Sequence, residues 1–218
     1  MARPPETRQE GKDRTRRKLL RAALKLLEKR SFDRLSLRQV TKEVGIVPGA
    51  FYRHFHDMDE LGLALVEESF GSLRGMIRSA RADVPTWDDA IVRSVETLVT
   101  HVHAHRTHFR FLVRERAGGT PALRAAIEDE LRAFTDELAV DMRGFPYLGD
   151  WDEEDITMLA SLVVATVMDT AAALTDLPRD RPEVEAAIIR TTERQLRLIF
   201  LGVPHWAPRP SSRHAGSG

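Results

Sequence analysis

Helical spacing of apolar side chains recurs along almost the whole 218-residue chain, and it limits the possible folds more than any other feature. Segment 13–30 places Leu19, Ala23 and Leu27 on one stripe with Arg and Lys residues opposite, as an amphipathic helix requires. Similar patterns predict helices over about 57–80, 85–105, 107–117, 121–143, 156–174 and 182–201. With two short helices between 37 and 54, the pattern predicts an all-α protein of about nine helices.

The composition excludes several classes of protein. The chain has no cysteine, which excludes disulfides, thiol chemistry and cysteine-ligated zinc fingers. We find no nucleophile elbow, phosphate-binding glycine loop or dinucleotide fingerprint, so we do not expect an enzyme or a cofactor. The sequence also lacks a run of about 18 uncharged apolar residues and an apolar leader, so we expect a cytoplasmic protein without a membrane partner.

Charge is distributed unevenly although the whole chain is formally neutral. Residues 1–56 contain 15 Lys or Arg and 6 Asp or Glu, a net charge of +9, whereas residues 57–218 contain 18 and 27, a net charge of −9. A basic N-terminal part followed by an acidic remainder is typical of a protein whose N-terminal part binds a polyanion. A basic helix that is simply exposed to solvent would have the same composition.

Local signals between residues 35 and 55 predict a helix-turn-helix. Ser36 and Gln39 have the spacing of a capping box, and Gly45 can take the left-handed conformation that ends a helix. Pro48 suits the first turn of the next helix, so the pattern predicts helices over 37–44 and 48–54. In such a motif the second helix enters the major groove of DNA.

The side chains expected on the outside of this motif fit DNA binding. Small residues at Gly49 and Ala50 let the helix backbone approach base edges, and Tyr52, Arg53 and His54 can donate hydrogen bonds. Arg53 can read guanine or clamp a phosphate, and Ser36 with the free amides behind it can hold a phosphate. We also expect Thr41 on this surface. The alternative is a helical corner whose aromatic residues only pack a core.

The segment LSLRQVTKEVGIVPGAFYRHFHDMDEL resembles the TetR family of bacterial repressors. The resemblance implies a homodimer on double-stranded palindromic operator DNA in the nucleoid, with a helical ligand and dimerisation domain behind the reading unit. One position departs from the family, because Met58 stands where many members have a phosphate-binding lysine. The predicted DNA contacts are Arg17, Ser36, Arg38, Val47, Pro48, Gly49, Ala50, Tyr52, Arg53 and His54.

Further segments, including FRFLVRERAGGTPALRAAIEDELRAF, are similar to the branch that represses unsaturated fatty-acid synthesis and responds to long-chain acyl-CoA. The resemblance leaves open whether such an effector strengthens or releases DNA binding. An acyl chain needs an apolar tunnel, whereas a CoA phosphate needs cations. The predicted ligand residues, several of which have the spacing of ordinary core residues, are Arg106, Phe109, Arg110, Leu112, Arg114, Phe134, Met158, Leu162 and Val163.

Two alternatives remain for the effector. One is another small hydrophobic compound, as in control of efflux or catabolism. The other is a metal ion, because His101, His105 and His108 have the i, i+4, i+7 spacing of one helix face, although a solvated face has the same pattern.

The last two helices are expected to pair with those of a second chain. The helix over 156–174 is apolar on nearly all sides, and 182–201 has a long apolar stripe. The predicted interface residues are Val167, Thr170, Ala171, Leu174, Ile188, Thr192, Leu196 and Ile199. The expected organisation is a flexible basic arm (1–12), a DNA-binding domain (13–56), a ligand and dimerisation domain (57–204) and a disordered tail (205–218).

Three glycines in the helix predicted over 57–80 each make helix formation less favourable, by about 1 kcal/mol relative to alanine. They are Gly62, Gly71 and Gly75. They indicate either close helix packing or a hinge between the two domains.

Overall fold

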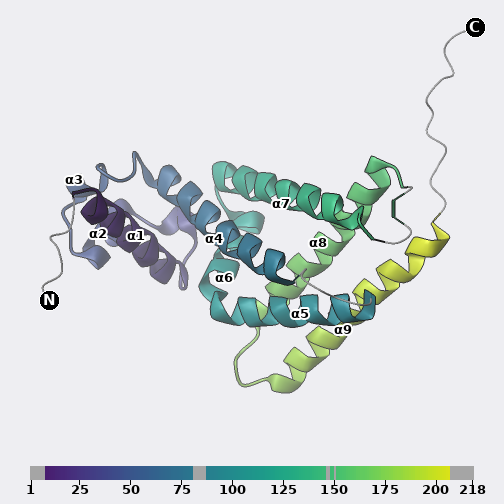
Figure 1. Ribbon diagram of the computed structural model, residues 1–218. Coiled ribbons are helices and arrows are strands. Elements are labelled where there is room, and N and C mark those ends of the chain that lie inside the picture. The colour runs from purple at the N-terminus through teal and green to yellow at the C-terminus, as the bar shows by residue number, and fades with distance from the viewer. Residues whose placement is uncertain (1–7, 81–86, 146–147, 150, 207–218) are drawn as a thin grey trace, which may run out of the picture.

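The computed structural model describes residues 8–80, 87–145, 148–149 and 151–206, and this part of the chain contains nine α-helices and no strand. The elements are α1 (Arg8–Leu27), η1 (Phe32–Arg34), α2 (Leu37–Val44), α3 (Pro48–Phe51), α4 (Met58–Ala80), α5 (Trp87–Ala104), α6 (Arg106–Gly118), α7 (Pro121–Met142), α8 (Glu153–Asp176), α9 (Pro182–Gly202) and η2 (Val203–His205). Figure 1 shows α1 to α3 gathered at one end, which we call the N-terminal unit, with α4 leading from it into the larger body of α5 to α9. The predicted all-α architecture is confirmed.

Capping groups explain where α2 ends and α3 begins. The Ser36 hydroxyl accepts a hydrogen bond from the Gln39 backbone N–H at 3.4 Å, and Gln39 Oε1 accepts one from the Ser36 N–H at 3.0 Å. Gly45 then ends α2 with a φ of 78°, in the left-handed region, and Pro48 opens α3. The capping box and glycine exit predicted from the sequence are both present.

The start of α4 is capped in a similar way. Asp57 Oδ1 accepts a hydrogen bond from the Glu60 N–H at 2.8 Å, and Glu60 Oε2 accepts one from the His56 N–H at 2.6 Å. These bonds satisfy two backbone donors that have no partner within the helix. They fix the direction in which α4 leaves the N-terminal unit.

Several boundaries differ from the sequence-based expectation. Because α1 begins at Arg8, residues 8–12 are helical although we expected a flexible arm. Helix α3 ends at Phe51 and not at residue 54, since the next three residues form a turn in which the His54 and Phe55 N–H groups both donate to Phe51 O. At the other end, His205 belongs to η2 and not to the tail. Pro85, Thr86 and residues 207–218 lie outside the described residues.

Thr41 is buried, with 1% of its surface exposed, although we expected it on the outside of the motif. Its hydroxyl donates to Leu37 O at 3.0 Å, so the polar group is satisfied within the helix. This back-bonding lets a threonine occupy a buried position between α1 and α2.

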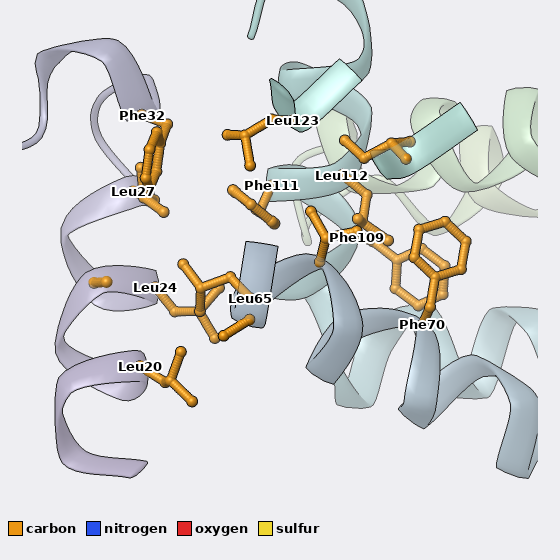
Figure 2. Packing of buried hydrophobic residues seen from close by; sticks show 14 of the residues in the cluster. Leu20, Leu24, Leu27, Phe32, Leu65, Phe70, Phe109, Phe111, Leu112 and Leu123 are labelled. Carbon is orange, nitrogen blue, oxygen red and sulfur yellow. The ribbon is translucent and has the colours of Figure 1, made fainter. Parts of the chain in front are cut away.

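One hydrophobic cluster runs from the N-terminal unit into the larger body. It joins side chains of α1, η1, α2, α3 and α4 to others from α5, α6, α7 and α8. Figure 2 shows Leu24 of α1 beside Leu65 of α4, and Leu27 and Phe32 across from Phe111 of α6 and Leu123 of α7. Burial of each such side chain contributes about 1.5–3 kcal/mol. The two parts of the molecule therefore share a core.

The glycines of α4 have different surroundings. A Cβ atom at Gly62 would lie 2.7 Å from Phe32 Cζ and 2.9 Å from Leu123 Cδ2, so this glycine permits close packing between α4, η1 and α7. A Cβ at Gly71 would meet nothing within 4 Å. The side chains around Gly75 lie outside the described part. Close packing thus explains Gly62 but not Gly71.

Helix α8 is long and apolar enough to cross a membrane by length and composition alone, with a mean hydropathy of 1.7 over its best 18-residue window. Our sequence analysis did not identify it as such. Buried core helices meet the same criterion, and Ile156, Ala160 and Ala171 of α8 are buried. The buried side of α8 packs against α7 and α9 in the same chain.

Candidate nucleic-acid interface

The start of α3 projects from the N-terminal unit with its backbone uncovered. Phe51 is fully buried and anchors the helix, whereas Val47 and Tyr52 on either side of α3 are 70% and 63% exposed. A Cβ at Gly49 would meet nothing within 4 Å, so the glycine is not needed for packing inside the chain. A short helix with a bare N-terminal turn can approach base edges closely.

The predicted DNA-contact residues all lie in the N-terminal unit. Arg17 of α1, Ser36 before α2, and Arg38 of α2 are exposed. Val47, Pro48, Gly49, Tyr52 and Arg53 are exposed as well, and Ala50 and His54 are half-buried. Their individual contacts with DNA stay predictions. Met58, at the position of the family's lysine, is half-buried against the main hydrophobic cluster and offers no charge to a phosphate.

Arg16 of α1 holds the turn after α3 in place, and the sequence analysis did not identify it. Its Nη1 donates to His54 O at 2.8 Å, its guanidinium lies 4.2 Å from the centre of the Phe55 ring, and it is 3.8 Å from Glu60 Oε1. A charge-assisted bond to the backbone and a cation–π contact together orient this turn. The available signal was its position four residues before Leu20, on the apolar face of α1.

The surroundings of His54 are basic. Burial lowers the pKa of His54 first, and the nearby positive charges of Lys12, Arg16 and Arg53 lower it further. Its Nδ1 atom is buried and has no hydrogen-bond partner among the described residues. These cations create a positive potential beside α3, as a DNA-binding surface requires.

The three arginines predicted to meet a CoA phosphate already bind backbone carbonyls. Arg106 Nε and Arg110 Nη2 donate to Thr175 O near the end of α8, at 3.2 and 2.9 Å, and Arg106 Nη2 also donates to Leu177 O. Arg114 Nη1 donates to Leu27 O at 3.1 Å and Arg30 O at 2.9 Å, after the end of α1. The arginines therefore join α6 to the C-terminal ends of α8 and α1, where cations are favoured.

Of the apolar residues predicted to line a ligand tunnel, Phe109, Leu112 and Phe134 belong to the main hydrophobic cluster, and Val163 packs against the smaller ones. Phe109 and Leu112 are buried in the main cluster, and Phe134 and Val163 are half-buried. Met158 and Leu162 are 39% and 47% exposed on α8, and their contact with a ligand stays a prediction. The spacing of residues on α8 did not distinguish its inner from its outer side, because both are apolar.

Most of the predicted dimer residues are at least partly covered within the single chain. Thr170, Ala171, Leu174, Thr192 and Leu196 are buried inside the single chain, and Val167, Ile188 and Ile199 are half-buried against its core clusters. The Thr170 and Thr192 hydroxyls are hydrogen-bonded at 2.8 Å. The buried members of this set are covered by their own chain and contribute to its core packing. Their contact with a second chain stays a prediction.

The histidine face forms other contacts. The His101 and His105 rings have centroids 4.4 Å apart, and His108 Nδ1 is 2.9 Å from Ser69 Oγ of α4. His103 Nε2 lies 3.2 Å from Glu185 Oε2 of α9. Within the described ranges, no group of three or more His, Asp or Glu residues is arranged to hold a metal ion. The metal-responsive alternative therefore has no support in this part of the chain.

A helix-turn-helix with a basic flank, built onto a larger helical body through a shared core, defines a transcription regulator of the one-component type. The family model described as "Bacterial regulatory proteins, tetR family" matches residues 19–65, and "Tetracyclin repressor-like, C-terminal domain" matches residues 88–201. The chain belongs to the TetR family of transcriptional regulators, which are not enzymes.

Solved structures show the same fold. A transcriptional regulator from Rhodococcus sp. Rha1 is 20% identical, with a TM-score of 0.66, and the match covers 88% of this chain and 99% of that one. FadR from Bacillus subtilis, solved in complex with stearoyl-CoA, is 14% identical with a TM-score of 0.66 and coverage of 85% and 98%. The fatty acid degradation regulator FadR from Bacillus halodurans is 13% identical with a TM-score of 0.65 and coverage of 86% and 95%.

Proposed function

We propose that this protein represses transcription as a homodimer on a palindromic operator, and that a long-chain acyl-CoA changes its affinity for that operator. The observation that carries the proposal is the surface of α3, where Val47, Gly49 and Tyr52 are exposed and a Cβ at Gly49 would meet nothing within 4 Å. Two such helices about 34 Å apart would match successive turns of an inverted repeat.

Selection of operators from random DNA tests the DNA-binding part, followed by fluorescence anisotropy with the selected sequence. Tyr52→Ala and Arg53→Ala should each weaken operator binding, by about 1–3 kcal/mol if the side chain reads a base. Arg34→Ala is the matched control, since Arg34 is exposed in η1 but lies outside the predicted contacts. Selection of no inverted repeat would overturn the proposal.

The proposed homodimer uses apolar side chains that are exposed on α8 and α9. Met158 and Leu162 lie four residues apart on one face of α8. On α9 the exposed apolar side chains are Val184, Leu198 and Leu201, with 43%, 73% and 69% of their surfaces exposed. A short connection makes these helices antiparallel neighbours, so Leu162 lies near the level of Leu201. An apolar surface of this kind marks a protein contact.

The acyl-CoA part rests on the similarity of the α6–α7 segment to the acyl-CoA-responsive branch and on the fold shared with a stearoyl-CoA-bound regulator. It is tested by repeating the anisotropy titration with stearoyl-CoA, with its mono-unsaturated counterpart and with free CoA. We expect the two thioesters to change operator affinity to different degrees, with no effect of CoA. If no thioester has an effect, DNA binding stands and the acyl-CoA assignment is overturned.

A further inference from the structure

A cleft of about 600 Å³ lies between the N-terminal part of α1 and the turn after α3. Its lining comes from two segments, Arg8, Gln9, Lys12 and Thr15 of α1 and Arg53 and His54 of the turn. Three of these six side chains are cations, and none is a carboxylate. The acids in the same part of α1, Glu10 and Asp13, are not among the lining residues, and Asp13 Oδ1 accepts a hydrogen bond from Gln9 Nε2 at 3.0 Å.

The two walls of the cleft are held in a fixed relation by Arg16. Its bond to His54 O at 2.8 Å and its contact with the Phe55 ring fasten the turn to α1, one helical turn beyond Lys12. Arg53 therefore stands opposite Arg8 and Lys12 before any ligand arrives. A preformed group of cations binds an anion with less loss of conformational entropy than free side chains do.

Most of the cleft belongs to a part of α1 that the family model does not include. The match to the TetR DNA-binding model begins at residue 19, whereas Arg8, Gln9, Lys12 and Thr15 all precede it. The cleft also lies beside the candidate reading surface, because Arg53 and His54 in its lining belong to the turn that directly follows α3. An anion in the cleft would therefore lie next to the C-terminal end of α3.

We propose that this α1–α3 cleft binds one backbone phosphate of operator DNA in each protomer, independently of base sequence. The inference rests on the proposed DNA-binding function and adds a contact to it. Guanidinium and ammonium groups without a lining carboxylate match a phosphodiester, and phosphate contacts of this kind position a protein on the duplex without reading its sequence.

The test compares how operator affinity depends on salt in the full-length protein and in two double variants. Arg8→Ala with Lys12→Ala removes two charges from the cleft. Lys29→Ala with Arg34→Ala removes two exposed charges beyond the C-terminal end of α1, roughly 20 Å from the cleft. Circular dichroism and thermal melting check that both variants are folded.

Each phosphate contact contributes about 0.9 to the slope of log K against log salt, so the cleft variant should lose about 1.8 from the slope of a dimer. At 0.15 M salt this corresponds to affinity about 30-fold weaker, on the operator and on random-sequence DNA alike. The preference for operator over random DNA should be unchanged, and the control variant should keep the wild-type slope.

The His54 ring provides a second measurement, followed by NMR in the wild-type protein and the cleft variant. A phosphate beside Lys12 and Arg53 should raise the pKa of His54 when random-sequence DNA is added, and the increase should be smaller in the cleft variant. If the cleft variant has the same slope as the control and the same His54 response as wild type, the cleft is not a phosphate site although DNA binding stands. If the wild-type protein binds no DNA, both proposals fail.

Discussion

Glu115 of α6 is a carboxyl group inside the molecule, where α6 meets the N-terminal unit. Only 1% of its surface is exposed, its Oε1 accepts a hydrogen bond from the Phe32 N–H at 3.0 Å, and its Oε2 has no hydrogen-bond partner among the described residues. Burial raises the pKa of Glu115 against the opposing effect of the Phe32 bond. A carboxylate with one unsatisfied oxygen therefore lies at the junction of the two parts.

The raised pKa predicts how stability depends on pH. Because the folded pKa lies above the ordinary value of 4.5, the contribution of Glu115 to stability is fully present below pH 4.5 and is lost as the pH rises through the folded value. Glu115→Gln cannot ionise, so its free energy of unfolding should increase relative to wild type over that pH range. Urea unfolding at several pH values measures this difference.

The control is Glu96→Gln, at an exposed position of α5, and this variant should follow the wild-type pH profile. A Glu115→Gln profile parallel to wild type would show that Glu115 is not the group responsible.

At the scale of the helix, α4 carries two glycines with opposite surroundings. Gly62→Ala places a Cβ against Phe32 and Leu123 of two other elements and should destabilise the protein by about 1–3 kcal/mol. Gly71→Ala meets open space and should stabilise the helix by up to about 1 kcal/mol. Thermal unfolding of the two variants compares a crowded glycine with an uncrowded one in the same helix.

Gly71→Ala also tests the hinge hypothesis for α4. If the glycine allows α4 to shift between DNA-binding states, the alanine variant should alter operator affinity or its response to effector. Unchanged values of both would leave Gly71 without a role in the response.

Helix ends were predictable from the sequence, whereas helix faces were predictable only in part. Ser36, Gly45 and Pro48 act through backbone bonds to near neighbours, so their positions in the sequence decide where α2 and α3 lie. In α8 apolar residues surround the axis, and its periodicity cannot show which side meets its own chain. Met158 and Leu162 were therefore assigned inward and Thr170 outward, the reverse of their observed burial. The cleft beside Arg53 depends on tertiary packing through Arg16 and left no local pattern.

On the scale of the whole molecule, the exposed apolar side chains of α8 and α9 predict the oligomeric state. Leu198→Glu places a charge at a side chain that is 73% exposed in the single chain, so the fold should remain while the dimer dissociates. Sedimentation velocity should then show a monomer, and operator affinity should fall about 100-fold or more through loss of bivalent binding.

Val140→Glu is the matched control, because Val140 is an equally exposed apolar residue (68%) on α7. Dimers in the Val140 variant and monomers in the Leu198 variant would support the assignment. Dimers in both would contradict it.

The hydrophobic cluster that Figure 2 shows has a consequence for protein engineering. Leu24, Leu27 and Phe32 of the N-terminal unit are covered by α4, α6 and α7, and Arg114 and Glu115 bond to the backbone of that unit. An N-terminal fragment that ends at residue 56 would expose this apolar surface to water. We therefore do not expect it to fold as an independent domain. Transfer of its operator specificity to another regulator calls for grafting the exposed residues of α3, with the surface beneath them left in its own context.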